Sequence, residues 1–394
     1  MPIDFQQVYL QIKAIGSEAQ RHQEALRERR AQARQLFERF ADQTSWLQER
    51  LQKALRVQPD LRCAIPLEPL STRYPPPKLE KTYTLLAADG SQIAPDRHAQ
   101  VLFGLVNIGL IELHQGSDET PHILTESHLL FDEELYHADG NLIADSELAL
   151  QRDLRERTLL AERAREAKKP AIALTDGPLE LWGAKELEER QAYRKELERH
   201  LSFLRNLARE GVVIAGYVDK PMANLVVRLL EIANLPENEL ARLKESFPLR
   251  GVSDRWLFGE PKHPLLRSGE RTAVFGLQSR SREFYRHEIA LHFFYLNVGS
   301  EEHPWPVRVE VPAWVAQEKS LLDLLHVALL EQCRLMGARP YPYLLHRAHE
   351  IAVVTWEEKS QLENLLAIEL RGQGQEVDEA SAKQSGKDAS RRSS

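Results

Sequence analysis

The sequence predicts an α/β protein, with a mixed sheet flanked by helices and an N-terminal helical segment before it. Three apolar, strand-like runs follow one another within residues 83–131, which is typical of an antiparallel meander. Helix and strand patterns then alternate over residues 145–247, which is typical of strands joined by crossover helices. Residues 5–57 contain no proline and carry apolar residues at helical spacing.

Four segments are expected along the chain. Residues 1–58 should form two or three helices, or one long pair, in which the basic stretch 27–34 either contacts phosphates or forms a solvated helix face. Residues 59–79 contain six prolines and should be an extended linker. Residues 80–371 should form the main domain. Residues 372–394 carry Val377 as their one large apolar residue, which predicts a disordered tail.

The elements of the main domain follow from apolar runs and from the Gly and Pro residues between them. The first strand should end at Asp89-Gly90, where glycine permits a sharp turn, and Ser146 is a plausible N-cap of the first helix. The expected strands are 83–88, 101–114, 122–131, 171–176, 212–219, 272–278, 288–298 and 307–311. The expected helices are 145–168, 185–209, 222–247 in two pieces around Pro236, 320–336, 341–354 and 356–370.

Composition limits the class of protein. The chain is 42% hydrophobic and 28% charged, has no apolar run long enough to cross a membrane, and lacks a secretory signal pattern. Two cysteines can form neither a disulfide framework nor a four-cysteine zinc site, so a cytoplasmic location is expected. A net charge of -7 argues against a uniformly basic nucleic-acid-coating protein, but not against a local basic groove.

Two strands each deliver an Asp-Gly pair at their C-terminal end. Asp89 and Asp176 therefore occupy equivalent places, and fixed carboxylates of this kind can bind divalent cations. An RNase H-like nuclease places two metal-binding aspartates in this way. Metal-assisted phosphodiester cleavage needs a few carboxylates that converge from different elements. The helix between the strands supplies further candidates, namely Glu147, Glu156, Glu162 and Glu166, of which Glu156 lies beside the apolar stripe.

Other residues are weaker candidates. His349 follows Tyr341 by eight residues, about two helical turns, and the pair serves either in catalysis, with the histidine as a metal ligand or proton carrier, or in core packing. Lys220 follows a strand end and can contact a phosphate or stay at the surface. Asp254 and Arg271 either complete a basic pocket or pair with each other. Basic residues should line one channel, drawn from Arg152, Arg155, Lys220, Arg255 and Arg271.

Taken together, these segments resemble the NurA family of DNA-end-processing nucleases. The resemblance covers residues 80–355 and rests on AADGSQIAPDRH at 87–98, VNIG in the next strand, RDLRE at 152–156, LTDGPL at 174–179, GYVDKP at 216–221, GVSDRWLF, GERTAVF, and YPYLLHRAHE at 341–350. It implies an RNase H-like core over residues 80–371. It places metal-binding aspartates on Asp89 and Asp176, the helical glutamate on Glu156, and the late tyrosine and histidine on Tyr341 and His349. Tyr343 and His346 are the alternatives, and Lys220 matches the family's lysine.

The resemblance also implies an activity and partners. Similar proteins depend on Mn²⁺, with Mg²⁺ as the alternative ion. They degrade DNA 5′ to 3′ and cut single strands internally. They form dimers and work with the hexameric ATPase HerA in resecting double-strand breaks. The absence of a Walker A loop from the sequence fits a nuclease with a separate motor.

Two other readings stay open on the sequence alone. One is a non-catalytic subunit that binds DNA ends or the ATPase on a nuclease fold. The other is an RNase H-like nuclease that acts on RNA or on DNA–RNA hybrids, because two-metal chemistry does not itself read the 2′-hydroxyl.

Overall fold

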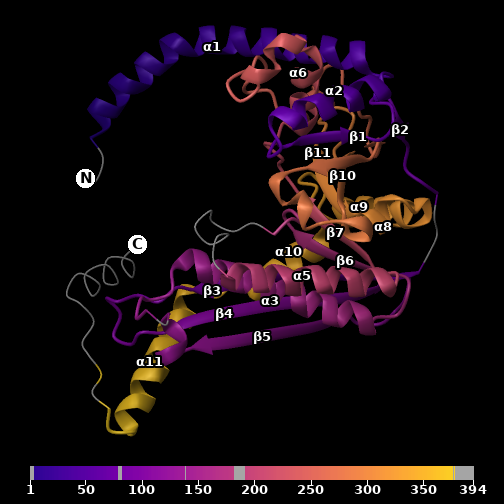
Figure 1. Cartoon of the computed structure of the whole chain (residues 1–394). Helices are drawn as coiled ribbons and strands as arrows, with labels where there is room; N and C mark the ends of the chain where they lie inside the picture. The colour runs from indigo at the N-terminus through magenta and orange to yellow at the C-terminus, as the bar shows by residue number, and fades with distance from the viewer. Residues whose placement is uncertain (1–3, 79–81, 138, 182–190, 376, 378–394) are drawn as a thin grey trace. The chain divides into compact units, whose positions relative to one another are not determined.

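The computed structural model describes residues 4–78, 82–137, 139–181, 191–375 and 377 (Figure 1). The chain divides into two compact units. Unit 1 comprises Met1–Leu79 with Tyr217–Pro340, and unit 2 comprises Glu80–Gly216 with Tyr341–Ser394. The division after Leu79 coincides with the predicted start of the main domain at residue 80, but the other divisions, after Gly216 and Pro340, fall inside that domain, which contributes to both units.

Two helices open unit 1, as the sequence predicts. Helix α1 spans Phe5–Phe40, and its N-cap Asp4 accepts a hydrogen bond from the Gln6 backbone nitrogen at 3.0 Å. Helix α2 spans Thr44–Val57 and buries an apolar stripe. Only the second half of α1 is buried in the unit, through Ala33, Leu36, Phe37 and Phe40.

An antiparallel sheet forms the core of unit 1, in the order β1-β9-β10-β11. The proline-rich stretch expected to be a linker supplies two of the unit's strands, because its short apolar segments pair with later strands. The strand expected at 272–278 is interrupted, since residues 273 and 274 leave the ladder. The strands are β1 Cys63–Pro66, β2 Arg73–Tyr74, β8 Arg271–Thr272, β9 Phe275–Gln278, β10 Leu291–Asn297 and β11 Pro306–Pro312.

Short helices surround this sheet. The helical stretch predicted around Pro236 is present as two pieces, and the loop predicted at 253–271 contains one further helical turn. The helices are α6 Leu225–Asn234, η2 Glu237–Arg242, α7 Asp254–Phe258, η3 Arg280–Glu283, η4 His287–Ile289, α8 Ala313–Ala316 and α9 Lys319–Leu335.

Asp254 is fully buried and joins these elements. Its carboxylate accepts hydrogen bonds from the Val226 and Val227 nitrogens, both at 2.8 Å, and from the Tyr295 hydroxyl at 2.7 Å. These bonds satisfy the open N-terminus of α6. Burial raises the pKa of Asp254 to about 6, against the opposing effect of the hydrogen bonds. Asp254 is therefore a structural residue, and its recorded partners do not include Arg271.

Unit 2 contains the mixed sheet that the sequence predicts. Strands β3, β4 and β5 form an antiparallel meander, and β6 pairs with β3 in parallel, giving the order β7-β6-β3-β4-β5. The boundary between the units falls inside β7. The strands are β3 Tyr83–Ile93, β4 Gly104–Gln115, β5 His122–Leu130, β6 Ala171–Asp176 and β7 Val213–Val218.

Helices cover both faces of this sheet. A Cβ atom on Gly90 would lie 2.6 Å from Cγ of Arg152 in α3, whereas one on Gly109 would lie 2.7 Å from the Ala352 nitrogen in α10. Helices α3 and α10 therefore pack on opposite faces, with α5 beside α3 (Figure 1). The helices are η1 Asp132–Leu135, α3 Asp145–Glu166, α5 Gln191–Arg209, α10 Tyr343–Ala352 and α11 Trp356–Gly372.

Helix α3 begins at Asp145, as predicted, but its N-cap is Ala144 and not Ser146. The Glu147 carboxylate accepts a hydrogen bond from the Ala144 backbone nitrogen at 3.0 Å. Residues 185–190 of a predicted helix and most of the predicted tail lie outside the described residues. Among the helices that the structure describes, none is long and apolar enough to cross a membrane.

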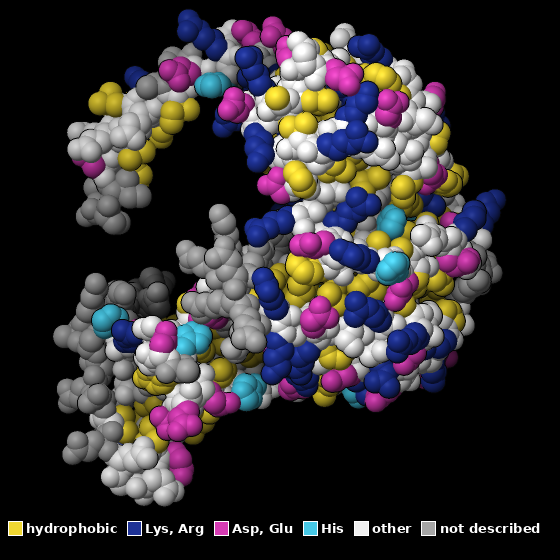
Figure 2. Space-filling view, viewed as in Figure 1, with side chains coloured by type: hydrophobic (Ala, Val, Ile, Leu, Met, Phe, Trp, Pro, Cys, Tyr) yellow, Lys and Arg dark blue, Asp and Glu magenta, His cyan; other side chains and the backbone are white. Residues whose placement is uncertain are grey.

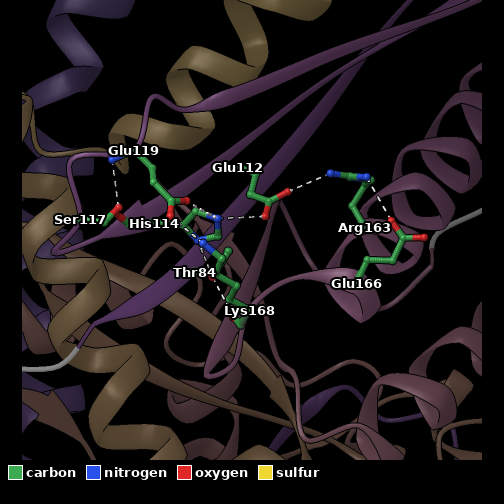
Figure 3. Close-up of polar contacts among 8 residues, drawn as sticks. All are labelled: Thr84, Glu112, His114, Ser117, Glu119, Arg163, Glu166 and Lys168. Carbon is green, nitrogen blue, oxygen red and sulfur yellow. Dashed lines mark hydrogen bonds and ion pairs between the residues drawn. The ribbon is translucent and has the colours of Figure 1, made fainter.

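A polar network links the end of the β3–β4 pair that contains Thr84 and His114 to the C-terminal end of α3 (Figure 3). The Thr84 hydroxyl donates to the Lys168 carbonyl at 2.7 Å, and Lys168 Nζ lies 2.6 Å from a Glu119 carboxylate oxygen. Glu112 is buried and pairs with Arg163 at 3.2 Å. The network fixes the start of β3 relative to α3, and therefore helps to position the residues farther along both elements.

Candidate active site

Asp89 lies within β3, and the turn predicted at Asp89-Gly90 is absent. The strand continues to Ile93, because residues 89–93 stay paired with β4. Only the parallel pairing with β6 stops here, with Ala88 opposite Thr175. Gly90 leaves room for the Arg152 side chain of α3, since a Cβ on residue 90 would lie 2.6 Å from Cγ of Arg152.

Asp176 ends β6, one residue beyond Thr175, as Asp89 is one residue beyond Ala88. The parallel register therefore places the two aspartates at equivalent positions on neighbouring strands, as the sequence predicts. Side chains alternate along a strand, so this register assigns both to the same face of the sheet. Gly177 follows with φ 86°, a left-handed conformation that favours glycine.

His349 is the partner of Asp89. Its Nδ1 lies 2.6 Å from Oδ2 of Asp89, with side-chain exposures of 62% for the histidine and 21% for the aspartate. Helix α10 can deliver this side chain because Gly109, opposite Asp89 in β4, has no Cβ to hold the helix away. The Asn107 amide and the Ser91 hydroxyl also fasten the end of α10, donating to the Ala352 carbonyl at 2.8 and 2.5 Å.

Glu156 lies on the other face, in α3, and is 7% exposed. Its Oε1 accepts a hydrogen bond from the Thr175 hydroxyl at 3.1 Å. Burial raises the pKa of Glu156 to about 8; Arg157 opposes this effect, and the charge of Asp89 adds to it. Thus Glu156 and Asp89 interact electrostatically near the end of the β3–β6 pairing, although they come from opposite faces.

The structure distinguishes Glu156 from the other glutamates of α3. Glu147 caps the helix and contacts Nε2 of His137 at 2.8 Å, while Glu166 is 71% exposed and pairs with Arg163. Glu162 is 48% exposed, at 3.9 Å from Arg155. Glu156 alone among the four is buried beside the strand ends.

The fit of a metal ion can be judged from these donors. Among the described residues, no group of three or more His, Cys, Asp or Glu side chains is close enough together to hold a metal ion. The convergent cluster of Asp89, Glu156 and Asp176 is therefore not assembled here. The donor chemistry nevertheless suits a hard cation, because the carboxylates of Asp89 and Glu156 repel each other and Glu156 has no cation at hydrogen-bond distance within the described residues.

The late tyrosine is placed differently from the prediction. Helix α10 begins at Tyr343, so Tyr341 precedes it and does not share a helical face with His349. The Tyr341 side chain is half-buried, and the residue interacts with another group of the protein. Of the two candidate histidines, His349 contacts Asp89. His346, the alternative, lies 3.6 Å from Glu350.

The residues predicted to contact DNA are distributed over both units. Arg155 is in unit 2 and forms an ion pair with Glu126, while Arg152 pairs with Asp153 at 2.6 Å. Lys220, Arg255 and Arg271 are in unit 1. Lys220 is exposed, whereas Arg255 stacks over the Trp305 ring at 4.0 Å.

Arg271 is removed from the candidates. It is 2% exposed, and its guanidinium lies over the rings of Tyr74 at 3.9 Å and Phe294 at 5.7 Å. A guanidinium enclosed in this way cannot reach a phosphate backbone. Thr175 and Gly109 are two site residues that sequence reasoning missed; their only signal was their place inside the segments LTDGPL and VNIG.

Comparisons with known proteins agree with the resemblance. The NurA domain family model matches residues 83–354. The NurA nuclease of Sulfolobus solfataricus is similar in structure, with 15% identity over 77% of this chain and 88% of its own, and a TM-score of 0.43. A NurA structure with manganese has 13% identity, 75% and 91% coverage, and a TM-score of 0.38. The catalytic domain of human endonuclease V has 14% identity, 81% and 96% coverage, and a TM-score of 0.32. No curated protein matches the chain.

Proposed function

Because the chain belongs to the NurA domain family, whose model matches residues 83–354, we propose that it is a metal-dependent deoxyribonuclease with an RNase H-like core. The observation that carries the proposal is the Asp89–His349 contact of 2.6 Å beside the buried Glu156, at the end of the β3–β6 pairing. A carboxylate–histidine pair on a rigid strand next to a carboxyl with a strongly raised pKa is typical of a catalytic site.

The residues have distinct roles in this proposal. Asp89, Asp176 and Glu156 would hold a divalent cation, Mn²⁺ or Mg²⁺, which supplies an activated water and neutralises charge on the phosphate. His349 uses Nδ1 to orient Asp89. The Nε2 atom of the exposed His349 ring then remains available to carry a proton. Burial raises the pKa of Glu156 to about 8, so a bound cation would favour the ionised form of this carboxyl at neutral pH.

The substrate side of the proposal follows the family resemblance. We infer 5′-to-3′ degradation of DNA ends and internal cleavage of single strands, in the resection of double-strand breaks. The test is digestion of end-labelled single-stranded DNA, duplex DNA, RNA and DNA–RNA hybrid with Mn²⁺, Mg²⁺ or EDTA. We expect Asp89→Asn and Asp176→Asn to lose several kcal/mol of transition-state stabilisation, at least about a 100-fold loss of rate.

Matched controls make this test specific. Glu166→Gln removes an exposed carboxylate of the same helix and should cut like the wild type. Near-wild-type cleavage by Asp89→Asn in Mn²⁺ would refute the site. Cleavage confined to RNA or hybrids would show that DNA is not the substrate. Binding of DNA ends without any cleavage would support a non-catalytic subunit.

We further propose that the protein acts as a homodimer with a HerA-like hexameric ATPase. Support comes from the first turns of α1, where Phe5, Tyr9, Leu10, Ile12 and Ile15 are between 56% and 68% exposed. Figure 2 shows apolar side chains along this part of the helix. The spacing of Phe5, Val8, Ile12 and Ile15 is that of a coiled-coil seam, which fits another helix.

A second copy of the chain is the proposed partner for this seam. The positions between the seam residues are uncharged except for Lys13, and three of them are glutamines, so two copies repel each other little, and the C-terminal tail lacks the apolar residues needed to cover the seam. Sedimentation at micromolar concentration should show a dimer that Ile12→Glu with Ile15→Glu dissociates and Gln6→Glu with Gln7→Glu does not. A wild-type monomer would refute the dimer. Co-purification with the ATPase tests the second partner, and duplex digestion unaided by it would contradict that part.

A further inference from the structure

A basic segment between β9 and β10 differs from the other basic regions of this acidic chain. Several arginines of the described residues pair with a carboxylate, among them Arg165 with Glu210 at 3.0 Å and Arg199 with Glu196 at 3.2 Å. Residues 280–287, RSREFYRH, hold three arginines and one histidine against a single glutamate. All four of these basic residues are exposed.

These residues surround a hollow in unit 1. The hollow has a volume of about 720 Å³, and Arg280, Arg282, Arg286 and His287 line it together with residues at the end of α2. Asp60 and Glu283 also line it, so the lining carries three guanidinium groups against two carboxylates, plus the histidine. Tyr285 anchors the segment, because its ring is 2% exposed in the core of the unit.

Arg282 is held in place by a neutral partner. Its Nη1 donates to Oε1 of Gln278 at 2.9 Å, and Gln278 is itself only 4% exposed. The Gln278 amide in turn donates to the Pro59 carbonyl at 3.3 Å. This arrangement orients the guanidinium without neutralising it. Burial first, and the charge of Arg282 in addition, lower the pKa of His292.

Arg286 and His287 complete the basic rim. Within the part of the chain that the structure describes, Arg286 has no carboxylate within ion-pair distance. His287 has φ 56°, a conformation that non-glycine residues rarely adopt and that is concentrated at functional sites. The fold therefore holds this exposed basic segment in a strained shape.

We propose that this hollow binds the phosphodiester backbone of the nucleic-acid substrate. The guanidinium fork matches phosphate oxygens with two donors, and several guanidinium groups along one segment match a linear polyanion better than a single small anion. Backbone contacts carry no sequence information, so binding is expected to be independent of sequence. The inference rests on the proposed nuclease function and names where that substrate is held.

The test measures binding of fluorescein-labelled single-stranded and duplex DNA by anisotropy, in EDTA so that no cleavage occurs. Arg282→Gln with Arg286→Gln should weaken binding about tenfold or more in moderate salt and reduce the salt dependence of log K by about 1.4 to 1.8, since each lost phosphate contact removes about 0.7 to 0.9. Arg165→Gln with Arg199→Gln is the charge-matched control, because both arginines are exposed and already paired. The control should bind like the wild type.

The outcomes separate this inference from the nuclease proposal. An unchanged affinity and salt slope in Arg282→Gln/Arg286→Gln, with cleavage in Mn²⁺ intact, would overturn the inference and leave the nuclease standing. A wild type that neither binds nor cleaves nucleic acid would overturn both. Equal losses in the charge-matched control would show a general charge effect and also overturn the site. Strong competition by low-millimolar inorganic phosphate would overturn recognition of a polymer.

Discussion

The buried carboxyl of Glu156 should make the stability of the protein depend on pH. Burial raises its folded-state pKa from 4.5 to about 8, so the folded protein retains a proton that the unfolded chain releases. Between these two pH values the unfolded state binds fewer protons, and the free energy of unfolding falls by about 1.4 kcal/mol per pH unit. The contribution is fully present below pH 4.5 and is lost as the pH rises through about 8, a total of about 5 kcal/mol.

Glu156→Gln isolates this effect. Glutamine has nearly the same shape, keeps an oxygen for the Thr175 hydroxyl, and cannot ionise. Measured by urea unfolding at pH 5, 6, 7 and 8, the variant should gain stability over the wild type by about 1.4 kcal/mol for each pH unit. Glu166→Gln is the control, because that carboxylate is 71% exposed in the same helix. A difference between Glu156→Gln and wild type that stays constant from pH 5 to 8 would refute the argument.

The same pair of proteins tests the role of Glu156 toward a cation. An ion that binds the ionised carboxylate stabilises only the folded state and offsets the cost of the buried charge. Manganese should therefore raise the unfolding free energy of the wild type at pH 8 more than that of Glu156→Gln. An equal effect of Mn²⁺ on both proteins would remove Glu156 from the metal-binding residues without changing its predicted pH dependence.

Three further substitutions test the packing around the site. Gly109→Ala places a Cβ 2.7 Å from the Ala352 nitrogen, so we expect α10 to be displaced, a loss of about 1–3 kcal/mol in urea unfolding and reduced cleavage; wild-type values for both would contradict the close approach. Asp254→Ala leaves two buried amides and the Tyr295 hydroxyl without their acceptor and should cost about 3 kcal/mol or more, whereas a loss below about 1 kcal/mol would show that these groups find other partners. His349→Gln should lower the cleavage rate while stability changes little, because the ring is 62% exposed; unchanged cleavage would exclude a catalytic role.

The order of elements in unit 2 could be predicted because each strand and helix shows its own periodicity. The place where β3 ends could not, since Asp89-Gly90 reads as a turn when only local residues are considered. Pairing with β4 as far as Ile93 overrides that signal, and the glycine serves a close helix contact instead. The prediction that Asp89 and Asp176 occupy equivalent positions was still correct, because it depends on the parallel register of β3 and β6 and not on a turn.

The full division into units, and whether each charged side chain is buried, paired or free, could not be predicted from the sequence. Short strands such as β1 and β2 lie in a proline-rich stretch, and only their partners in β8 and β9 reveal them. Likewise, Arg271 and Arg282 look alike in the sequence, yet one is enclosed by aromatic rings and the other is exposed and held by a neutral amide. Whether a charge is buried, paired or free is a property of tertiary contacts, so the basic residues named from the sequence were partly the wrong ones.

Two regions of the described residues carry charge that a ligand could compensate. Unmatched charge is costly when buried and raises the local potential when exposed. In unit 2 the charge of Asp89 disfavours ionisation of the buried Glu156, and in unit 1 Arg282 and Arg286 present positive charge without an ion pair among the described residues. A divalent cation suits the first and a phosphate backbone suits the second, and these are the two charged species that metal-assisted cleavage of a nucleic acid must bring together.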